Sequence, residues 1–400
     1  MIPRPAALGH LVMYRDTDQL VKVVTGVRRC GKSTLLGMLK DHLLSQGVPA
    51  ENVFALNFED FGLADVDTAE KLHDLVTAHS FGAGRRYLLF DEIQLVAQWE
   101  KVINSLRLDS RHDIYITGSN LGLLGSQLAT LLSGRYVRLD TFPLSFAEYL
   151  QARPENPQVS RRQRFMEYLS GGGLPGLSNL PDDAQVVREY LDGVLSTIVL
   201  KDVAAVHDVR DVDALQKVIR YLAANVGHHV TAAGIAHYLV SSGRRISADT
   251  VDNYLRLLED AFLFYRARRF DLRSKATMKT NDKFYLVDLG FRSLLLGPGV
   301  TDIGRLLENV VYFELRRRGH SVSVGQHGAQ EVDFVATGPD GGPHYYQVTL
   351  SLLDPTTAAR ELAPLRAIRD HYPKTVLSLD DIASRDYDGI AHQNLLDFLL

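Results

Sequence analysis

The chain has 400 residues, 46% of them hydrophobic and 23% charged, and a formal net charge of −4. This length exceeds one compact core and predicts two or three domains, while the nearly balanced charge excludes a general attraction to nucleic acid, so any basic patch is local. The only cysteine is Cys30, which excludes an intrachain disulfide and a cysteine-based zinc site and is typical of a reducing compartment.

The first residues carry no sign of secretion or membrane insertion. They lack a charged segment followed by a long apolar one, and no apolar run in the chain approaches the ~18 residues of a membrane span. No low-complexity tract and no repeat of fixed period is present. We therefore expect a soluble, cytoplasmic protein without a membrane partner.

A complete P-loop motif follows the first predicted strand, residues 21–25. The motif G-x-x-x-x-G-K-[ST] is matched by Gly26, Val27, Arg28, Arg29, Cys30, Gly31, Lys32, Ser33 and Thr34. Residues 35–44 then repeat apolar side chains at helical spacing. The motif thus lies between a strand and a helix, which is the context that nucleotide binding requires.

These nine residues predict the contacts of a nucleotide. The glycines let backbone N–H groups turn toward the β- and γ-phosphates, Lys32 supplies a positive charge, and the Ser33 hydroxyl binds Mg²⁺. No N-K-x-D segment of the guanine-recognising type is present, which favours ATP over GTP. Arg28 and Arg29 are either solvated residues at the tip of the loop or contacts to phosphate or DNA.

Predicted strands and helices alternate after the P-loop. Strands at 53–57, 87–90 and 114–117, with helices between them, predict a parallel sheet covered on both faces. The strand at 87–90 ends in Asp91 and Glu92, at the sheet edge where ligands bind. Asp91 is the predicted magnesium ligand and Glu92 the general base for water; the alternative is a solvated turn.

Two further polar positions are candidates for the same site. Ser119 and Asn120 follow the strand at 114–117, as a γ-phosphate sensor or as helix caps. Arg135 precedes another predicted strand and is either an arginine finger for a neighbouring subunit or a surface ion-pair residue. A finger acting in trans implies a homo-oligomer.

Five blocks carry a resemblance to a known family: 26–34, 87–94, 116–120, 132–136 and 143–150. They resemble the bacterial and archaeal AAA-type ATPases that carry an uncharacterised C-terminal domain, and the resemblance covers almost the whole chain. It implies an AAA+ core over residues 1–152, with Lys32, Ser33, Asp91 and Glu92 at the Walker positions. The resemblance implies a mechanism and leaves the biological role and the protein client open.

Residues 153–211 are predicted to form a helical linker or lid. Pro154 and Pro157 interrupt the helical pattern there. The run 171–176, Gly-Gly-Gly-Leu-Pro-Gly, is not a second P-loop because no lysine follows it. It resembles the G-G-[FL]-P turn of the same ATPases and is either a hinge of the lid or a rigid turn.

Residues 212–300 predict a winged helix. Helices are expected at 215–224, 231–239 and 247–260, capped by Thr231 and Ser247, with strands at 262–268 and 283–288 forming the wing. The third helix is acidic, which argues against base recognition by that face. The wing is basic and predicts DNA phosphate contacts, a solvated loop or a subunit contact through Arg266, Arg268, Arg269, Arg273, Lys275, Lys279 and Lys283.

Residues 301–400 resemble the core of PD-(D/E)xK nucleases. Glu308 on a predicted helix and Asp333 on a predicted strand match two metal-ligand positions. An active member would read acid-x-Lys on the next strand, but this chain reads Gln347-Val348-Thr349. We therefore expect a restriction-endonuclease-like fold without cleavage, unless Glu331 replaces the lost ligand.

The sequence as a whole predicts an α/β protein that binds and hydrolyses ATP with Mg²⁺. Hydrolysis would move the winged-helix and C-terminal modules, with DNA as an optional partner. The alternatives are a DNA-binding regulator that ATP switches and an ATP-gated, metal-dependent nuclease.

Overall fold

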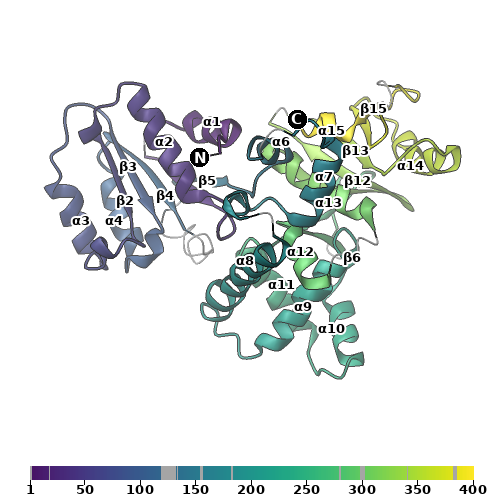
Figure 1. Ribbon diagram of the computed structural model, residues 1–400, viewed down its shortest axis with the longest axis horizontal. Coiled ribbons are helices and arrows are strands. Elements are labelled where there is room, and N and C mark those ends of the chain that lie inside the picture. Colours follow the sequence, from purple (N-terminus) through teal and green to yellow (C-terminus); the bar gives the residue numbers. More distant parts are fainter. Residues whose placement is uncertain are drawn as a thin grey trace. The chain divides into compact units, whose positions relative to one another are not determined.

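The chain folds into two compact units, Met1–Pro143 and Leu144–Leu400 (Figure 1). The computed structural model describes residues 2–17, 19–118, 132, 134–153, 156–181, 183–278, 281–297, 302–339, 341–381 and 385–400. The first unit ends before residue 152, and the division of the rest into three domains stays a prediction. None of the helices in these ranges combines the length and apolarity needed to cross a bilayer.

The first unit is built around a parallel sheet of five strands in the order β2-β3-β4-β1-β5. This confirms the predicted α/β core. Its elements are α1 (Pro5–Met13), β1 (Val21–Thr25), α2 (Lys32–Ser45), β2 (Val53–Asn57), α3 (Ala69–Ala78), β3 (Arg86–Asp91), α4 (Trp99–Leu106), β4 (His112–Thr117) and β5 (Tyr136–Asp140).

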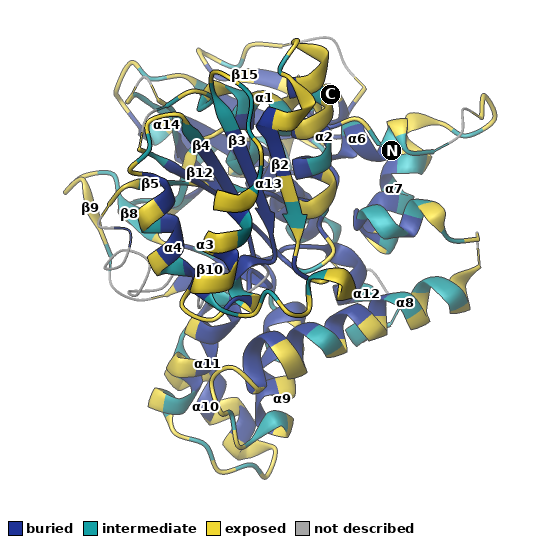
Figure 2. Cartoon of the chain, turned by 90° about the vertical axis from the view of Figure 1, so that its left-hand side faces the viewer, coloured by how far each residue is buried: buried dark blue, intermediate teal, exposed yellow. Residues whose placement is uncertain are grey.

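Side chains that alternate along the strands cover both faces of this sheet. In β3, Leu88 and Phe90 pack with α3 and α4, whereas Tyr87 and Leu89 pack with α1 and α2. Figure 2 shows the central strands as buried, with exposed residues on the outer sides of the helices. Successive side chains of a strand point to opposite faces of the sheet. Because both sets are apolar here, helices must cover both faces.

The strand order determines which loops meet at the site. β4 lies between β1 and β3, with Val24 paired to Thr117 and Phe90 paired to Ile116. Because the strands are parallel, the residues that follow β1, β3 and β4 emerge at one edge. The P-loop, the Asp91–Glu92 pair and Thr117 are thereby brought to the same edge.

The second unit contains helices and two sheets. Its helices are α6 (Phe146–Gln151), α7 (Arg161–Gly171), α8 (Ala184–Thr197), α9 (Val212–Ala224), α10 (Ala232–Ser241), α11 (Ala248–Asp260), α12 (Leu289–Leu296), α13 (Ile303–Arg317), α14 (Pro355–Ala367) and α15 (Leu395–Phe398). Its strands are β6 (His229–Val230), β7 (Phe264–Ala267), β8 (Arg269–Asp271), β9 (Ala276–Thr277), β10 (Asp282–Leu286), β11 (Ser321–His327), β12 (Gln330–Thr337), β13 (Pro343–Val348), β14 (Lys374–Ser378) and β15 (Ala391–Asn394).

The helices α9, α10 and α11 lie where the sequence predicts them. The Thr231 hydroxyl accepts a hydrogen bond from the Gly234 N–H at 3.0 Å, and the Ser247 hydroxyl accepts one from the Thr250 N–H at 3.1 Å. Both residues are therefore N-caps, as predicted. β6, β10 and β7 form a three-stranded antiparallel sheet beside them.

The second sheet has seven strands in the order β15-β14-β13-β12-β11-β8-β9. β8 and β9 form a hairpin in the connection between β7 and β10, and β8 pairs in parallel with β11. Hydrogen bonds thus cross the boundary predicted at residue 300. Part of the predicted wing is an edge of the C-terminal sheet.

The glycine run after α7 packs tightly against the start of α12. Gly172 has a φ of +85°, and a Cβ there would lie 1.9 Å from an Asp288 carboxylate oxygen. That carboxylate accepts hydrogen bonds from the N–H groups of Gly173 at 2.7 Å and Gly290 at 2.8 Å. These contacts favour the rigid turn over the hinge.

Candidate nucleotide-binding site

The P-loop backbone adopts a shape that depends on its glycines. Gly26 has a φ of +150° and Gly31 a φ of +101°. A Cβ on Gly26 would lie 2.0 Å from the carbonyl oxygen of Thr141, so no other residue fits without displacing that segment. Arg29 also has a positive φ, 67°, and turns of this kind expose consecutive N–H groups that bind anions.

The side chain of Lys32 reaches back to the P-loop carbonyls that precede α2. Lys32 is the first residue of α2 and 4% exposed, and its Nζ donates hydrogen bonds to the carbonyl oxygens of Gly26 at 3.1 Å and Val27 at 3.3 Å. Ser33 and Thr34, the next two residues of α2, are exposed. The buried Lys32 ammonium and the positive N-terminal end of α2 therefore lie together at the P-loop. This arrangement is suited to binding phosphate.

The other loop residues divide into buried and exposed positions. Val27 and Cys30 are fully buried, and burial raises the pKa of the Cys30 thiol, so the sulfur is protonated at neutral pH. Arg29 is exposed and Arg28 is half-buried. Val27 and Cys30 can therefore contribute only backbone groups to a ligand.

Asp91 and Glu92 are held at the end of β3 by Thr117. The Thr117 hydroxyl donates a hydrogen bond to Asp91 Oδ1 and accepts one from the Glu92 N–H at 3.1 Å. Glu92 is 7% exposed and has a left-handed backbone with a φ of 53°, and Gln94 Nε2 donates to its carboxylate. Such a backbone is strained in a residue other than glycine and persists where neighbours fix it.

Sequence reasoning missed Thr117 and Gln94. The available signal was that a polar residue ends the buried strand at 114–117, but the position of that strand between β1 and β3 could not be deduced. Adjacent strands lie about 4.8 Å apart, so the P-loop strand and the Asp91 strand are about 10 Å apart with Thr117 between them. Ser119 and Asn120, the predicted sensor residues, lie outside the described residues.

Arg135 lies at the opposite edge of the sheet. It is exposed and immediately precedes β5, and its carbonyl accepts a hydrogen bond from the N–H of Val21, the first residue of β1. The P-loop begins after the last residue of β1, one strand length of about 16 Å away. An arginine finger role for Arg135 therefore requires a second copy of the chain.

The arrangement fits ATP and Mg²⁺ on three grounds. The loop has no room for a Cβ at Gly26, the Lys32 ammonium is bound by backbone carbonyls of the same loop, and Ser33 and Asp91 provide hard oxygen atoms at the same sheet edge. Glu92 lies beside Asp91 as an acceptor for a proton of water. Together these groups can bind a triphosphate and polarise a nucleophile.

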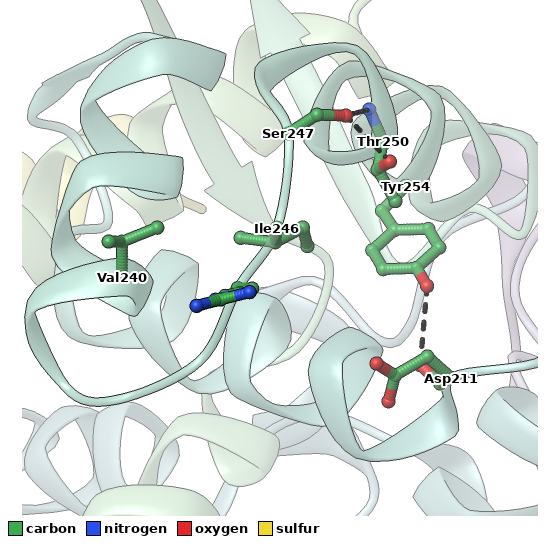
Figure 3. Close-up of a pocket in the computed structure, with 7 residues that line it drawn as sticks. Asp211, Val240, Ile246, Ser247, Thr250 and Tyr254 are labelled. Carbon is green, nitrogen blue, oxygen red and sulfur yellow. Dashed lines mark hydrogen bonds between the residues drawn. The ribbon is translucent and has the colours of Figure 1, made fainter.

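A separate open recess of about 640 Å³ lies between α10 and α11 in the second unit (Figure 3). Its polar groups are largely used within the protein: Ser247 caps α11, and the Tyr254 hydroxyl donates to the Asp211 carbonyl at 3.3 Å. The Asp211 carboxylate forms an ion pair with Arg244. Because these polar groups are bonded to other parts of the protein, the recess does not indicate a ligand site. No P-loop residue lines it.

The acidic residues of the predicted nuclease core do come together, but around a lysine. Lys283 of β10 is 1% exposed, and its ammonium lies 3.1 Å from Glu308 and 2.7 Å from Glu331. Asp333 lies close enough to interact with this charge; burial and the neighbouring Glu308 raise its pKa. Over the residues that the structure describes, no three acidic, histidine or cysteine side chains form a metal-binding group.

The predicted basic wing is less continuous than the sequence indicates. Arg266 pairs with Glu259 at 2.8 Å, Arg269 donates to Gln326 at 2.9 Å, and Lys283 is buried among carboxylates. These three side chains are bound within the chain. The exposed basic residues of this segment are Arg268, Arg273 and Lys275, and Lys279 lies outside the described residues.

The five-stranded parallel sheet and its edge define an α/β protein of the P-loop nucleotide-binding class. Residues 18–150 match the family described as an AAA domain, and residues 162–301 match a domain of unknown function. An uncharacterized protein of Haemophilus influenzae is 39% identical, with 100% of this chain and 99% of that protein covered. The uncharacterized protein MJ1544 of Methanocaldococcus jannaschii is 30% identical, with 90% and 80% covered.

The chain therefore belongs to the same family as these two proteins, and its first part matches an AAA domain. Among solved structures, the Walker-type ATPase PABY2304 of Pyrococcus abyssi is similar, with a TM-score of 0.52 at 15% identity. The similarity covers 74% of this chain and 96% of that chain. It shows that the fold is shared.

Proposed function

We propose that this protein is a magnesium-dependent ATPase whose nucleotide cycle changes the conformation of the second unit. One observation carries the proposal: the P-loop with Lys32 and the Asp91–Glu92 pair lie at one sheet edge, and Thr117, on the strand between them, binds both Asp91 and Glu92. Two adjacent carboxylates beside a phosphate-binding loop are suited to hydrolysis more than to binding alone.

Each residue has a defined part in this proposal. Lys32 and the loop N–H groups bind the phosphates, Ser33 and Asp91 hold the metal ion, and Glu92 accepts a proton from the attacking water. Mg²⁺ neutralises part of the phosphate charge when it is bound. Thr117 keeps Asp91 and Glu92 in a fixed relation, and Gln94 orients the Glu92 carboxylate.

The test is steady-state ATP hydrolysis by the purified chain with Mg²⁺. We expect turnover that Lys32→Ala and Glu92→Gln each reduce at least about 100-fold. Glu59→Gln is the matched control, since Glu59 is an exposed acid after β2 and should leave turnover unchanged. Equal activity in the wild type and in Glu92→Gln would assign the signal to a contaminant and refute the proposal.

A second candidate function is ATP-switched binding of DNA phosphates. Its support is the exposed set Arg268, Arg273 and Lys275 in the connection between β7 and β10. Three phosphate contacts predict that replacing all three by Gln lowers the slope of log affinity against log salt by about 3. Fluorescence anisotropy with duplex and single-stranded DNA measures this slope, with and without ATP.

The matched control replaces three exposed basic residues elsewhere, Lys40, Arg188 and Arg220, by Gln. It removes the same charge, so a general electrostatic effect would weaken both variants equally. DNA affinity that does not depend on salt, or equal losses in both triple variants, would exclude this candidate.

The third candidate, a nuclease, is disfavoured by Lys283. Its ammonium binds Glu308 and Glu331, and the Gln347 amide donates to Glu361 at 3.2 Å. We therefore propose a binding or assembly role for residues 301–400. Nicking of supercoiled plasmid with Mn²⁺ that Asp333→Ala abolishes would contradict this.

A further inference from the structure

One buried guanidinium links the P-loop to the segment that leads out of the first unit. Arg4 lies just before α1 and is 5% exposed. Its Nη1 donates to the Cys30 carbonyl of the P-loop at 3.0 Å, and its Nη2 donates to the Phe142 carbonyl at 2.8 Å. The same Nη2 lies 3.5 Å from the carbonyl of Pro143, the last residue of the unit.

The contact to Cys30 bears directly on phosphate binding. In a trans peptide the carbonyl of one residue and the N–H of the next point in opposite directions. Arg4 holds the Cys30 carbonyl, so it also fixes the direction of the Gly31 N–H, on the opposite side of the peptide plane. Gly31 immediately precedes Lys32 and α2, where backbone N–H groups bind phosphates in P-loops.

The contacts to Phe142 and Pro143 belong to a segment that the P-loop strand already touches. The Thr141 N–H donates to the Thr25 carbonyl at 2.6 Å. The Thr141 carbonyl occupies the space that a Cβ on Gly26 would need. The loop and residues 141–143, which we call the exit segment, are therefore packed together at Gly26 and joined by hydrogen bonds at Arg4.

We propose that Arg4 is a positioning residue that orients the P-loop amides and transmits a change in the loop to the exit segment. This inference rests on the proposed function, because it requires that the loop binds a nucleotide. The planar guanidinium can bind carbonyls of two elements at once, which a single ammonium does poorly. A merely structural role would instead affect stability alone.

The experiment compares Arg4→Met and Arg4→Lys with Arg15→Met in the full chain. Arg15 is the matched control, since its Nε donates to the Tyr87 hydroxyl at 3.0 Å, at the opposite sheet edge. Binding of a fluorescent ATP analogue gives the dissociation constant, and thermal unfolding reports the fold. We expect the affinity to fall about 30-fold in Arg4→Met and about 10-fold in Arg4→Lys, and to stay unchanged in Arg15→Met.

Hydrogen exchange without nucleotide provides a second measurement. Arg4→Met should speed exchange in peptides covering both 26–34 and 141–146, whereas Arg15→Met should change neither. In the wild type, the ATP analogue should slow exchange in both peptides, and this linked response should be lost at 141–146 in the Arg4 variants. Arg4→Lys carries the test if Arg4→Met does not fold.

The possible results distinguish the inferred role of Arg4 from the proposed ATPase function. Folded Arg4 variants that bind the analogue with wild-type affinity and keep the linked exchange response would overturn the inference and leave the proposed function intact. A wild-type chain that binds no analogue would refute the proposed function and the nucleotide part of the inference. The exchange without nucleotide would then still decide whether Arg4 joins the loop to the exit segment.

Discussion

The hydroxyl of Thr117 donates a hydrogen bond to the carboxylate of Asp91 across two adjacent strands. It also accepts the N–H of Glu92, so one side chain aligns both acids. Thr117→Val keeps the shape and removes the hydroxyl. Because an unmade buried hydrogen bond costs about 1–3 kcal/mol, we expect kcat for ATP to fall about 10- to 100-fold with KM changed less than about 3-fold.

Thr117→Ser keeps the hydroxyl and should retain most of the turnover, as measured by the same steady-state assay. A Thr117→Val variant with wild-type kcat would mean that the hydroxyl does not align the acids during turnover.

Gly26 of the P-loop has no room for a Cβ. We expect Gly26→Ala to abolish binding of the ATP analogue, because the new methyl group would overlap the Thr141 carbonyl. Gly37→Ala is the control: its Cβ meets nothing within 4 Å in the middle of α2. That change should raise the free energy of unfolding by about 1 kcal/mol. Unaltered nucleotide affinity in Gly26→Ala would show that the exit segment moves easily to make room for the added methyl group.

Lys283 neutralises a buried group of carboxylates. Lys283→Met would leave Glu308, itself 5% exposed, with Arg305 at 2.6 Å and the Tyr285 hydroxyl at 3.4 Å. We expect a loss of about 3 kcal/mol in the free energy of unfolding, because the carboxylates of Glu308, Glu331 and Asp333 lose the ammonium that they share. Calorimetry of the full chain measures it.

The double variant Lys283→Met with Glu308→Gln should recover part of this loss, since it removes one of the carboxylates that share the Lys283 ammonium. Additive effects of the two changes would show that the pair does not interact.

The carboxyl group of Asp288 makes the free energy of unfolding depend on pH. Burial raises its pKa to about 6 from 3.8, against the lowering effect of the N–H groups of Gly173 and Gly290. The folded state therefore holds the proton more tightly, and the free energy of unfolding should decrease as pH rises from about 4 to about 6, then level off. The full contribution is about 3 kcal/mol.

The comparison with Asp288→Asn isolates this contribution from that of other groups. The difference between the denaturation curves of the wild type and the variant should change across pH 4–6 and be constant above it. A constant difference over the whole range would show that the pKa of Asp288 is not raised.

Sequence reasoning predicted correctly those features of the fold that depend on a local residue pattern. The P-loop lies between a strand and a helix, the strands of the first unit alternate with helices, and Thr231 and Ser247 cap the helices predicted for them. Each of these features depends on residues a few positions apart. The caps were identified because a hydroxyl before an apolar periodic segment satisfies free N–H groups.

The features that sequence reasoning missed depend on contacts between distant residues. Arg4 reaches a carbonyl 138 positions away, and Lys283 of β10 reaches Glu308 of α13, 25 positions away. Thr117 acquires its place only from the order of the strands, which periodicity does not reveal. The predicted charge of the basic wing was too high for the same reason, because Arg269 donates to Gln326, 57 positions further along the chain.

The β8–β9 hairpin limits how this protein can be divided. A fragment comprising only residues 301–400 would lose the strand that pairs with β11. The edge of β11 that faced β8 would then present unpaired N–H and C=O groups to solvent, a surface that readily joins other chains. Separate expression of the last hundred residues should thus yield aggregates, whereas a fragment starting at Leu144 keeps the sheet whole.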